Sequence, residues 1–266
     1  MKIKEILCEL IACGRNRTQY IAEYLTSLGL VVEVKEYLPG HKNIEFVTSN
    51  DKAKQDIIFF VHHDISLKTR EGANDNTSSV AVLLALAKSI RGKAFPYNIR
   101  LVFTDNEELL GALSPSTTAE KLQQIMPHVG SFMYLSKFAD KKNIRHIIVM
   151  ELSGIGDSIY VASQSGNVMT DVSLNKKLLD IAERNNFQSV QLKLPSTDML
   201  SVKVFGVSGT VIGAIPYYQA QNYVMQGKMF PAVWQNIHSE KDNQFAIQEK
   251  SLEMMRDFLL HILEEL

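Results

Sequence analysis

Two runs of this 266-residue sequence are apolar almost throughout and then end in polar side chains. They are DIIFFVHHD (56–64) and IRHIIVMELS (144–153). Strands of this composition are typical of a sheet that helices cover on both faces. Helical patterns at 74–90 and 173–186 alternate with such runs along the chain. The sequence therefore predicts an α/β fold with a sheet between layers of helices.

The remaining segments extend this alternation. Residues 30–38 and 43–49 alternate in polarity around the turn-forming PGHKN, which predicts a β-hairpin. Residues 98–108 predict a strand that ends in acids. The other expected elements are an N-terminal amphipathic helix, a loop with a short helix at 112–130, further elements at 192–200 and 207–215, and a last helix at about 248–265. Because no repeat, linker or low-complexity tract separates them, we expect a single domain over residues 1–266.

Composition and charge restrict the partners of the chain. Hydrophobic residues make up 45% of the sequence and charged residues 21%, as in an ordinary globular protein. The 28 basic and 29 acidic residues nearly cancel and form no basic block, so nucleic acid is not an expected partner. No uncharged apolar run approaches membrane-spanning length, and no membrane partner is expected. Cys8 and Cys13 lack the spacing of a metal pair or a disulfide framework, which favours a reducing, cytoplasmic setting.

Polar residues gather where the predicted strands end, and open α/β sheets bind ligands at that edge. His62 and Asp64 are two residues apart, so in an extended chain they share one face while His63 points to the other. Asp64 could then hold the His62 imidazole in one tautomer while its other nitrogen binds a metal. By itself, this spacing is more typical of a solvated loop pair.

Two acidic segments have a structural as well as a chemical interpretation. GANDN (72–76) precedes a helix, which Asn74 or Asp75 could cap. The Asp75 carboxylate could instead bridge two cations with its two oxygens. Glu107 and Glu108 end a predicted strand, where they would face roughly opposite directions. One could bind metal and the other take a proton from the attacking water, although adjacent acids also occur in solvated loops.

Glu151 and His238 complete the candidate set. Glu151 ends the apolar run IRHIIVMEL, where a carboxylate is costly unless it is paired or bound to something. His238 lies in NIHSEKDN before the last helix, and by itself a loop histidine indicates little. With His62, Asp75 and Glu108 these residues form a set of nitrogen and oxygen donors without a thiolate. Such a set favours zinc in a catalytic site that is open to water, and cobalt or manganese could substitute.

Five motifs, taken together, resemble a known enzyme family. HHD, GANDN, DNEE, MELSG and IHSEKD are similar in order and spacing to motifs of the co-catalytic zinc aminopeptidases and their relatives, the glutaminyl cyclases. The resemblance extends over about residues 56–243. It implies a single zinc-exopeptidase-like catalytic domain with a twisted mixed sheet, mostly parallel, flanked by helices on both faces.

The resemblance also implies two zinc ions per chain and a ligand set for each. His62 and Glu151 would hold one ion, and Glu108 and His238 the other. Asp75 would bridge the two ions. These ligand assignments come from the family pattern and not from the spacing of the residues.

Three further roles follow from the same resemblance. Asp64 would orient His62, and Glu107 would be the general base. The segment STDMLSVKVFG (196–206) is similar to the family stretch that lines the substrate site, which makes Asp198 a candidate for binding or orienting the substrate.

The sequence departs from the family pattern at several positions. Ser78-Ser79 stands where the family usually has Ser-Gly, Glu151 where it usually has Asp, and Met199 where a histidine is common. The stretch 109–150 is longer than the pattern predicts, so a loop that covers the pocket is expected to differ. Glutamate at position 151 is long enough to reach a metal, so these departures bear on substrate choice more than on chemistry.

The resulting functional hypothesis is release of an N-terminal residue from a peptide or aminoacyl substrate. One alternative is glutaminyl cyclase-type acyl transfer, since FPAVWQNIHSEKDN (230–243) resembles the tryptophan-containing loop of those enzymes. The Asp75-Asn76 pair favours two metals and hence hydrolysis. Another alternative is an inactive homologue that serves as a binding module, which the full donor set disfavours. Candidates for an apolar pocket wall, although such residues more often pack in a core, are Tyr217, Tyr218, Tyr223, Met225 and Met229.

Overall fold

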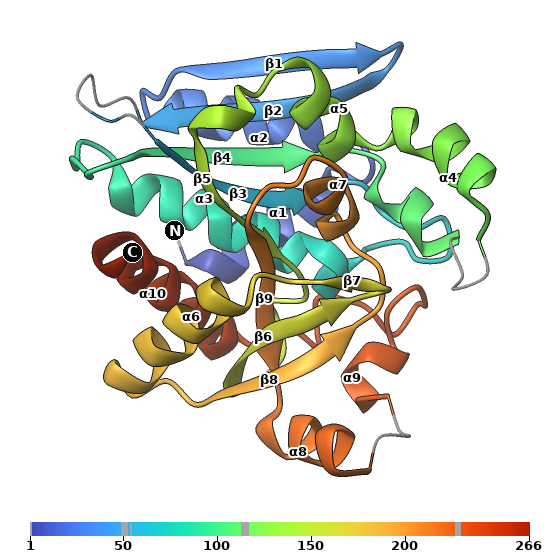
Figure 1. Cartoon of the computed structure of the whole chain (residues 1–266), viewed down its shortest axis with the longest axis vertical. Coiled ribbons are helices and arrows are strands. Elements are labelled where there is room, and N and C mark those ends of the chain that lie inside the picture. Colours follow the sequence, from blue (N-terminus) through green and yellow to red (C-terminus); the bar gives the residue numbers. More distant parts are fainter. Residues whose placement is uncertain (1, 49–52, 54, 113–116, 227–229) are drawn as a thin grey trace.

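The central strands of the protein are parallel and lie between two layers of helices. The computed structural model describes residues 2–48, 53, 55–112, 117–226 and 230–266. Its nine-stranded sheet has the order β1-β2-β4-β3-β5-β9-β6-β7, with β8 paired to β6 (Figure 1). The strands are β1 (Val32–Leu38), β2 (His41–Thr48), β3 (Asp56–His62), β4 (Asn98–Thr104), β5 (Ile144–Met150), β6 (Ser158–Ser165), β7 (Val168–Met169), β8 (Ser189–Leu194) and β9 (Gly209–Ile215).

The direction of the strands confirms a mixed sheet. Strand β3 runs parallel to both β4 and β5, and β5 runs parallel to β9. Antiparallel pairs flank this parallel centre, with β1 and β2 on one side and β6 on the other. In the register, His62 pairs with Thr104 and Phe60 pairs with Val149. The carboxyl ends of β3, β4 and β5 therefore meet at one edge of the sheet, where α/β sheets bind ligands.

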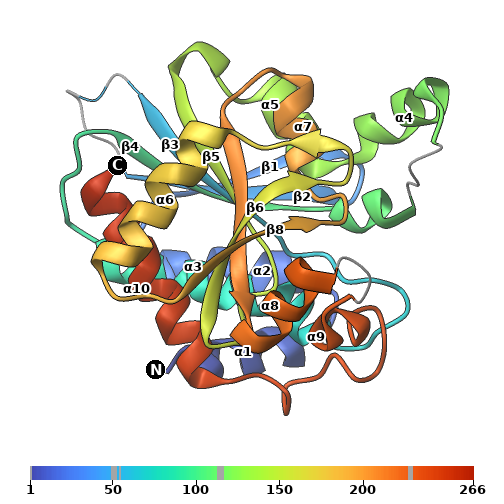
Figure 2. The same cartoon turned by 60° about the horizontal axis from the view of Figure 1, so that its bottom comes forward.

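Helices cover both faces of this sheet. Figure 2 shows α3 and α10 on the opposite side of the sheet from α5 and α7. The core on the first side includes residues of α1 (Ile3–Ala12), α2 (Arg17–Ser27), α3 (Ser78–Ile90), α6 (Val172–Arg184) and α10 (Glu249–Glu265). The core on the second side includes residues of α5 (Gly130–Lys137), α7 (Met199–Val204), α8 (Tyr217–Gln226) and α9 (Ala232–Gln235). The short helix α4 (Ala119–Ile125) buries no residue and projects from the body (Figure 1).

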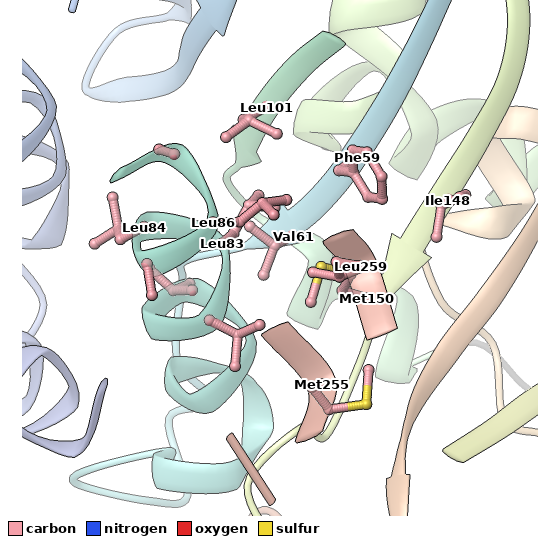
Figure 3. Packing of buried hydrophobic residues seen from close by; sticks show 14 of the residues in the cluster. Phe59, Val61, Leu83, Leu84, Leu86, Leu101, Ile148, Met150, Met255 and Leu259 are labelled. Atoms are coloured by element: carbon pink, nitrogen blue, oxygen red, sulfur yellow. The ribbon is translucent and has the colours of Figure 1, made fainter. Parts of the chain in front are cut away.

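The alternation of side chains along β3 connects the two cores. Phe59 and Val61 belong to the core beneath α3 and α10, whereas Ile58 and Phe60 belong to the core beneath α5 and α7. Figure 3 shows Phe59 and Val61 beside leucines of α3 and the Leu259 side chain of α10. Because every residue of β3 is buried, its end at His62 is held rigidly between the two layers.

Two expectations about the bounds of elements are wrong in detail. The helix expected over 74–90 begins only at Ser78, because Asp75 and Asn76 have non-helical backbone angles. The strand expected over 98–108 ends at Thr104, and the chain then turns at Asn106, whose φ is 62°.

The N-terminal region also differs from the expectation, since it forms two helices and not one. Gly14, with φ of 57°, lies in the break between α1 and α2. Strand β6 was not predicted at all, although it lies inside the sheet between β8 and β9. None of the described helices combines the length and apolar character that crossing a membrane requires.

We expect substitution of Leu83 by alanine to lower the free energy of unfolding by about 2–5 kcal/mol, because this side chain is fully buried in α3. Urea denaturation followed by circular dichroism measures the effect. Leu67→Ala is the matched control, since Leu67 is 90% exposed and its loss creates no cavity. Equal destabilisation by both substitutions would contradict the packing described for α3.

Candidate functional site

A first cluster of donor atoms surrounds the imidazole of His62 at the end of β3. Its Nε2 atom lies 3.3 Å from Asp75 Oδ1 and 3.4 Å from Glu151 Oε2. Glu107 Oε2 is a little farther away, at 3.9 Å. His62, Asp75 and Glu151 are all buried and offer ligand atoms within 4.8 Å of one another, an arrangement that could hold a metal ion.

A second cluster surrounds the imidazole of His238. Its Nε2 atom lies 3.0 Å from Glu108 Oε2 and 3.1 Å from Asp75 Oδ2. These three residues form the second group whose ligand atoms lie within 4.8 Å of one another. The Asp75 carboxylate thus turns one oxygen to each histidine, which is the geometry of a group that bridges two ions. The structure thus brings together His62 with Glu151 and Glu108 with His238, the pairs that are predicted to share an ion.

Asp75 belongs to an irregular turn, Ala73–Thr77, that precedes α3. The peptide between Asp75 and Asn76 is cis. The interpretation of Asn74 or Asp75 as a helix cap is wrong, since Thr77 is the N-cap of α3. The Asn74 side chain instead accepts a hydrogen bond from Gly154 N at 2.8 Å. The Asp75 carboxylate is therefore left to face the histidines.

Asp64 connects His62 with the two adjacent glutamates. Its Oδ1 atom lies 3.3 Å from His62 Nδ1, and the two groups interact electrostatically without the alignment of a hydrogen bond. The same carboxylate accepts hydrogen bonds from the backbone amides of Glu107 and Glu108, both at 3.1 Å. His63 points away and contacts Lys42 O, as the strand geometry predicts.

Glu107 and Glu108 open a 3-10 turn, Glu107–Ala112, and are not part of an extended strand. Their carboxylates nevertheless have different surroundings. The Glu108 carboxylate contacts His238 and accepts a hydrogen bond from Ser66 N at 2.9 Å. Glu107 lies near His62 and belongs to neither of the two donor groups.

Glu151 follows the last residue of β5 and is 5% exposed. Its backbone carbonyl accepts a hydrogen bond from the Tyr160 hydroxyl at 2.7 Å. Gly213 permits this approach, because a Cβ atom at that position would lie 1.8 Å from Glu151 O and 2.5 Å from the Tyr160 hydroxyl oxygen. Tyr160 was not predicted, because no strand was expected at 158–165; the alternating SIYVAS (158–163) was the signal for that strand.

The carboxylates and imidazoles of the site shift one another's pKa values. Burial opposes the charge of His62, but Glu151 and Glu107 outweigh it and raise the pKa of the imidazole. Contact with Asp75 and Glu108 raises the pKa of His238 to about 10. Burial raises the pKa of Glu151 to about 7 and raises the pKa of Glu107 strongly. Without a metal, the site therefore retains protons that a cation would displace.

The donor set fits a pair of divalent cations such as zinc. Imidazole nitrogens and carboxylate oxygens without a thiolate are the ligands of catalytic zinc. Glu151 Oε1 is buried and has no hydrogen-bond partner among the residues that the structure describes, which is costly for a carboxylate oxygen unless a cation binds it. His62 presents Nε2 to the cluster while Nδ1 faces Asp64, the usual arrangement behind a metal-bound imidazole.

A pocket of about 250 Å³ opens beside the two clusters. Its lining includes the carboxylates of the two clusters and His238, and also the apolar side chains of Leu152, Leu194 and Ile237. Of the candidates for an apolar wall, Tyr218 and Met225 are 64% and 84% exposed and are not among the residues that line this pocket. The lining includes neither Tyr217 nor Tyr223. Met229 lies outside the described residues.

Asp198 is fully buried and is not itself among the residues that line this pocket. Its carboxylate accepts hydrogen bonds from the hydroxyls of Thr104, at 2.7 Å, and Ser131, at 2.5 Å. Its neighbours Ser196 and Thr197 are among the lining residues. Burial raises the pKa of Asp198, and its charge in turn raises the pKa of Glu107.

The fold and the two clusters define an α/β protein with a candidate two-ion centre at the carboxyl edge of its sheet. The chain belongs to peptidase family M28, whose family model matches residues 43–263. This membership supports a metal-dependent hydrolase. No curated protein matches the chain in sequence.

Solved structures with this fold include both aminopeptidases and glutaminyl cyclases. A leucine aminopeptidase precursor from Bacteroides thetaiotaomicron has a TM-score of 0.74 at 19% identity, with 98% of this chain and 95% of that chain covered. A glutaminyl cyclase from Porphyromonas gingivalis has a TM-score of 0.74 at 16% identity, with 99% and 97% covered. The zinc aminopeptidase BSAP from Bacillus subtilis has a TM-score of 0.62 at 18% identity; the match covers 84% of this chain but about half of BSAP, 49%.

We expect metal binding to release protons, and more of them at pH 6 than at pH 8. At pH 6 both His238, with a pKa of about 10, and Glu151, with a pKa of about 7, carry protons in the metal-free site. At pH 8 Glu151 is already ionised, so the apparent zinc affinity rises as the pH increases through 7. Calorimetric titration in buffers of different ionisation enthalpy measures the protons released. Equal affinity and proton release at both pH values would contradict the described electrostatics.

Proposed function

We propose that the protein is a di-zinc aminopeptidase that removes the N-terminal residue from peptides. The observation that carries the proposal is the Asp75 carboxylate, which presents one oxygen to the cluster of His62 and the other to the cluster of His238. In this proposal His62, Asp75 and Glu151 hold one ion, and Asp75, Glu108 and His238 hold the other. When bound, the ions would polarise the scissile carbonyl and make the attacking water more acidic.

Glu107 is the proposed general base. It lies beside both clusters without belonging to either, and its backbone is fixed by Asp64. Its carboxylate would accept a proton from water as the water oxygen attacks the carbonyl carbon, and would then return that proton to the amine as the C–N bond breaks. Asp64 orients the His62 imidazole. Asp198 is proposed to help position the substrate indirectly, because it accepts a hydrogen bond from Thr104 and follows the lining residues Ser196 and Thr197.

The pocket supports a substrate with a free amino group and an apolar side chain. The carboxylates that line the pocket favour binding of a cationic amine, whereas Leu152, Leu194 and Ile237 offer an apolar surface. A panel of aminoacyl chromogenic substrates, assayed with zinc, cobalt and manganese, tests this choice. A cytoplasmic location is part of the proposal, since Cys8 and Cys13 are free thiols.

Glutaminyl cyclase activity is the alternative that a specific observation favours. The Porphyromonas gingivalis glutaminyl cyclase has the same fold at nearly the same length. Trp234 also precedes His238 in this chain, although its indole packs edge-on against Tyr160 at 6.0 Å and does not line the pocket. Incubation with a peptide that begins with glutamine separates the two activities. An aminopeptidase releases free glutamine, whereas a cyclase releases ammonia and leaves the peptide bonds intact.

We expect Glu107→Gln to lower kcat by at least about 10²-fold while zinc stays bound, because glutamine has the same shape but cannot accept the proton. Steady-state kinetics and metal analysis of the purified variant measure the two effects. Glu253→Gln, on the exposed surface of α10, is the matched control. An active Glu107→Gln enzyme would remove Glu107 from its proposed role.

A further inference from the structure

Asp242 joins the loop of His238 to the turn of Asp75. Its side chain is 3% exposed, and its two carboxylate oxygens accept hydrogen bonds from Asn74 N at 2.6 Å and Asp75 N at 3.1 Å. Its backbone carbonyl accepts a further bond from Ala73 N at 3.4 Å. Asp242, four positions after His238, therefore accepts hydrogen bonds from three successive backbone amides of the turn.

Asn76 joins the same turn to the end of β5. Its side-chain Nδ2 donates to Met150 O at 2.8 Å, and its Oδ1 accepts from Leu152 N at 3.2 Å. These two backbone groups flank Glu151 on either side. Asn76 is fully buried, so its amide holds Glu151 and Asp75 at a fixed separation.

The two bridges act on different donor groups. Asp75 shares one group with His62 and Glu151, and it shares the other with Glu108 and His238. Asn76 spans the first group, from Asp75 to Glu151. Asp242 joins the turn of Asp75 to the loop of His238, since its own amide also donates to Ser239 O, next to His238. Each bridge thus links the turn of the shared carboxylate to the segment of one partner ligand.

We propose that Asp242 and Asn76 are positioning residues that set the affinities of the two metal sites separately. Asp242 controls the site of His238 and Glu108, and Asn76 controls the site of His62 and Glu151. Neither side chain contributes a ligand atom to the donor groups. Groups that hold a ligand in this way typically change metal affinity by about 10–100-fold when they are removed. The inference rests on the proposed two-ion centre.

The Asp242→Asn variant tests the proposal. Asparagine has the same shape, but its NH2 group cannot accept a bond from an amide, so one of the two bridges to the turn is lost. Zinc titration by calorimetry should show one site weakened by about 10–100-fold and the other unchanged. Asn76→Ala should show the opposite selectivity. Should Asp242→Asn not fold, Asp242→Ser provides the same titration with a smaller side chain.

Ligand variants identify which site has changed. With His238→Ala, only the site of His62 remains, and adding Asp242→Asn should leave its affinity unchanged. With Glu151→Gln, the site of His238 remains, and adding Asp242→Asn should weaken it by about 10–100-fold. Equal weakening in both backgrounds, or in neither, would overturn the proposal.

Two controls separate this inference from other failures. Asp171→Asn is the matched control. Like Asp242, the Asp171 carboxylate accepts hydrogen bonds from two backbone amides, those of Ser173 and Leu174 at the start of α6. Asp171 belongs to neither donor group nor to the pocket lining, so its loss should affect stability and leave zinc binding unchanged. A wild-type protein that binds fewer than two ions would refute the proposed function itself, whereas normal wild-type binding with unselective variants refutes only the positioning roles.

Discussion

The main constraint on the candidate site is an excess of buried negative charge at one edge of the sheet. Asp75, Glu107 and Glu151 are each at most 8% exposed, and the nearby imidazole of His62 cannot balance all three. Buried carboxylates are costly unless they are paired or bound to a cation. The pKa shifts express the same imbalance, since the carboxylates raise the pKa of both His62 and His238. A pair of divalent cations would replace protons and relieve this repulsion, which is why the site and the family membership point to the same chemistry.

The sheet brings these residues together. Strands β3, β4 and β5 are parallel neighbours, so the chain leaves each of them at the same edge. His62 ends β3, Glu151 follows β5, and the two glutamates open the turn just after β4. The buried apolar layers on both faces keep these strand ends in place. The two remaining ligands, Asp75 and His238, come from a buried turn and a loop, which the Asp242 side chain joins through hydrogen bonds to Asn74 N and Asp75 N.

This division explains how the site could differ from its relatives without losing its chemistry. Glu151 is longer than the aspartate that the family pattern usually has, and its segment is held by Tyr160 across Gly213 and by the amide of Asn76. The backbone around the ligand is thus closely fixed, while its carboxylate reaches His62. Leucine and isoleucine side chains shape the neighbouring pocket, so substrate preference can change there while the donor groups stay the same.

The sequence by itself determined the periodicities and the donor types. The apolar runs of β3 and β5 predicted buried strands, and the ordered motifs predicted the donors His62, Asp75, Glu108, Glu151 and His238. It did not determine the turn at Ala73–Thr77, strand β6, or the separate roles of Asn76 and Asp242. Those features depend on contacts between residues distant in the chain, such as Asp242 with Asn74 and Asn76 with Leu152. Local patterns decide which residues become strands and helices, but only the packed tertiary structure decides which polar groups lose water and must find partners in one another.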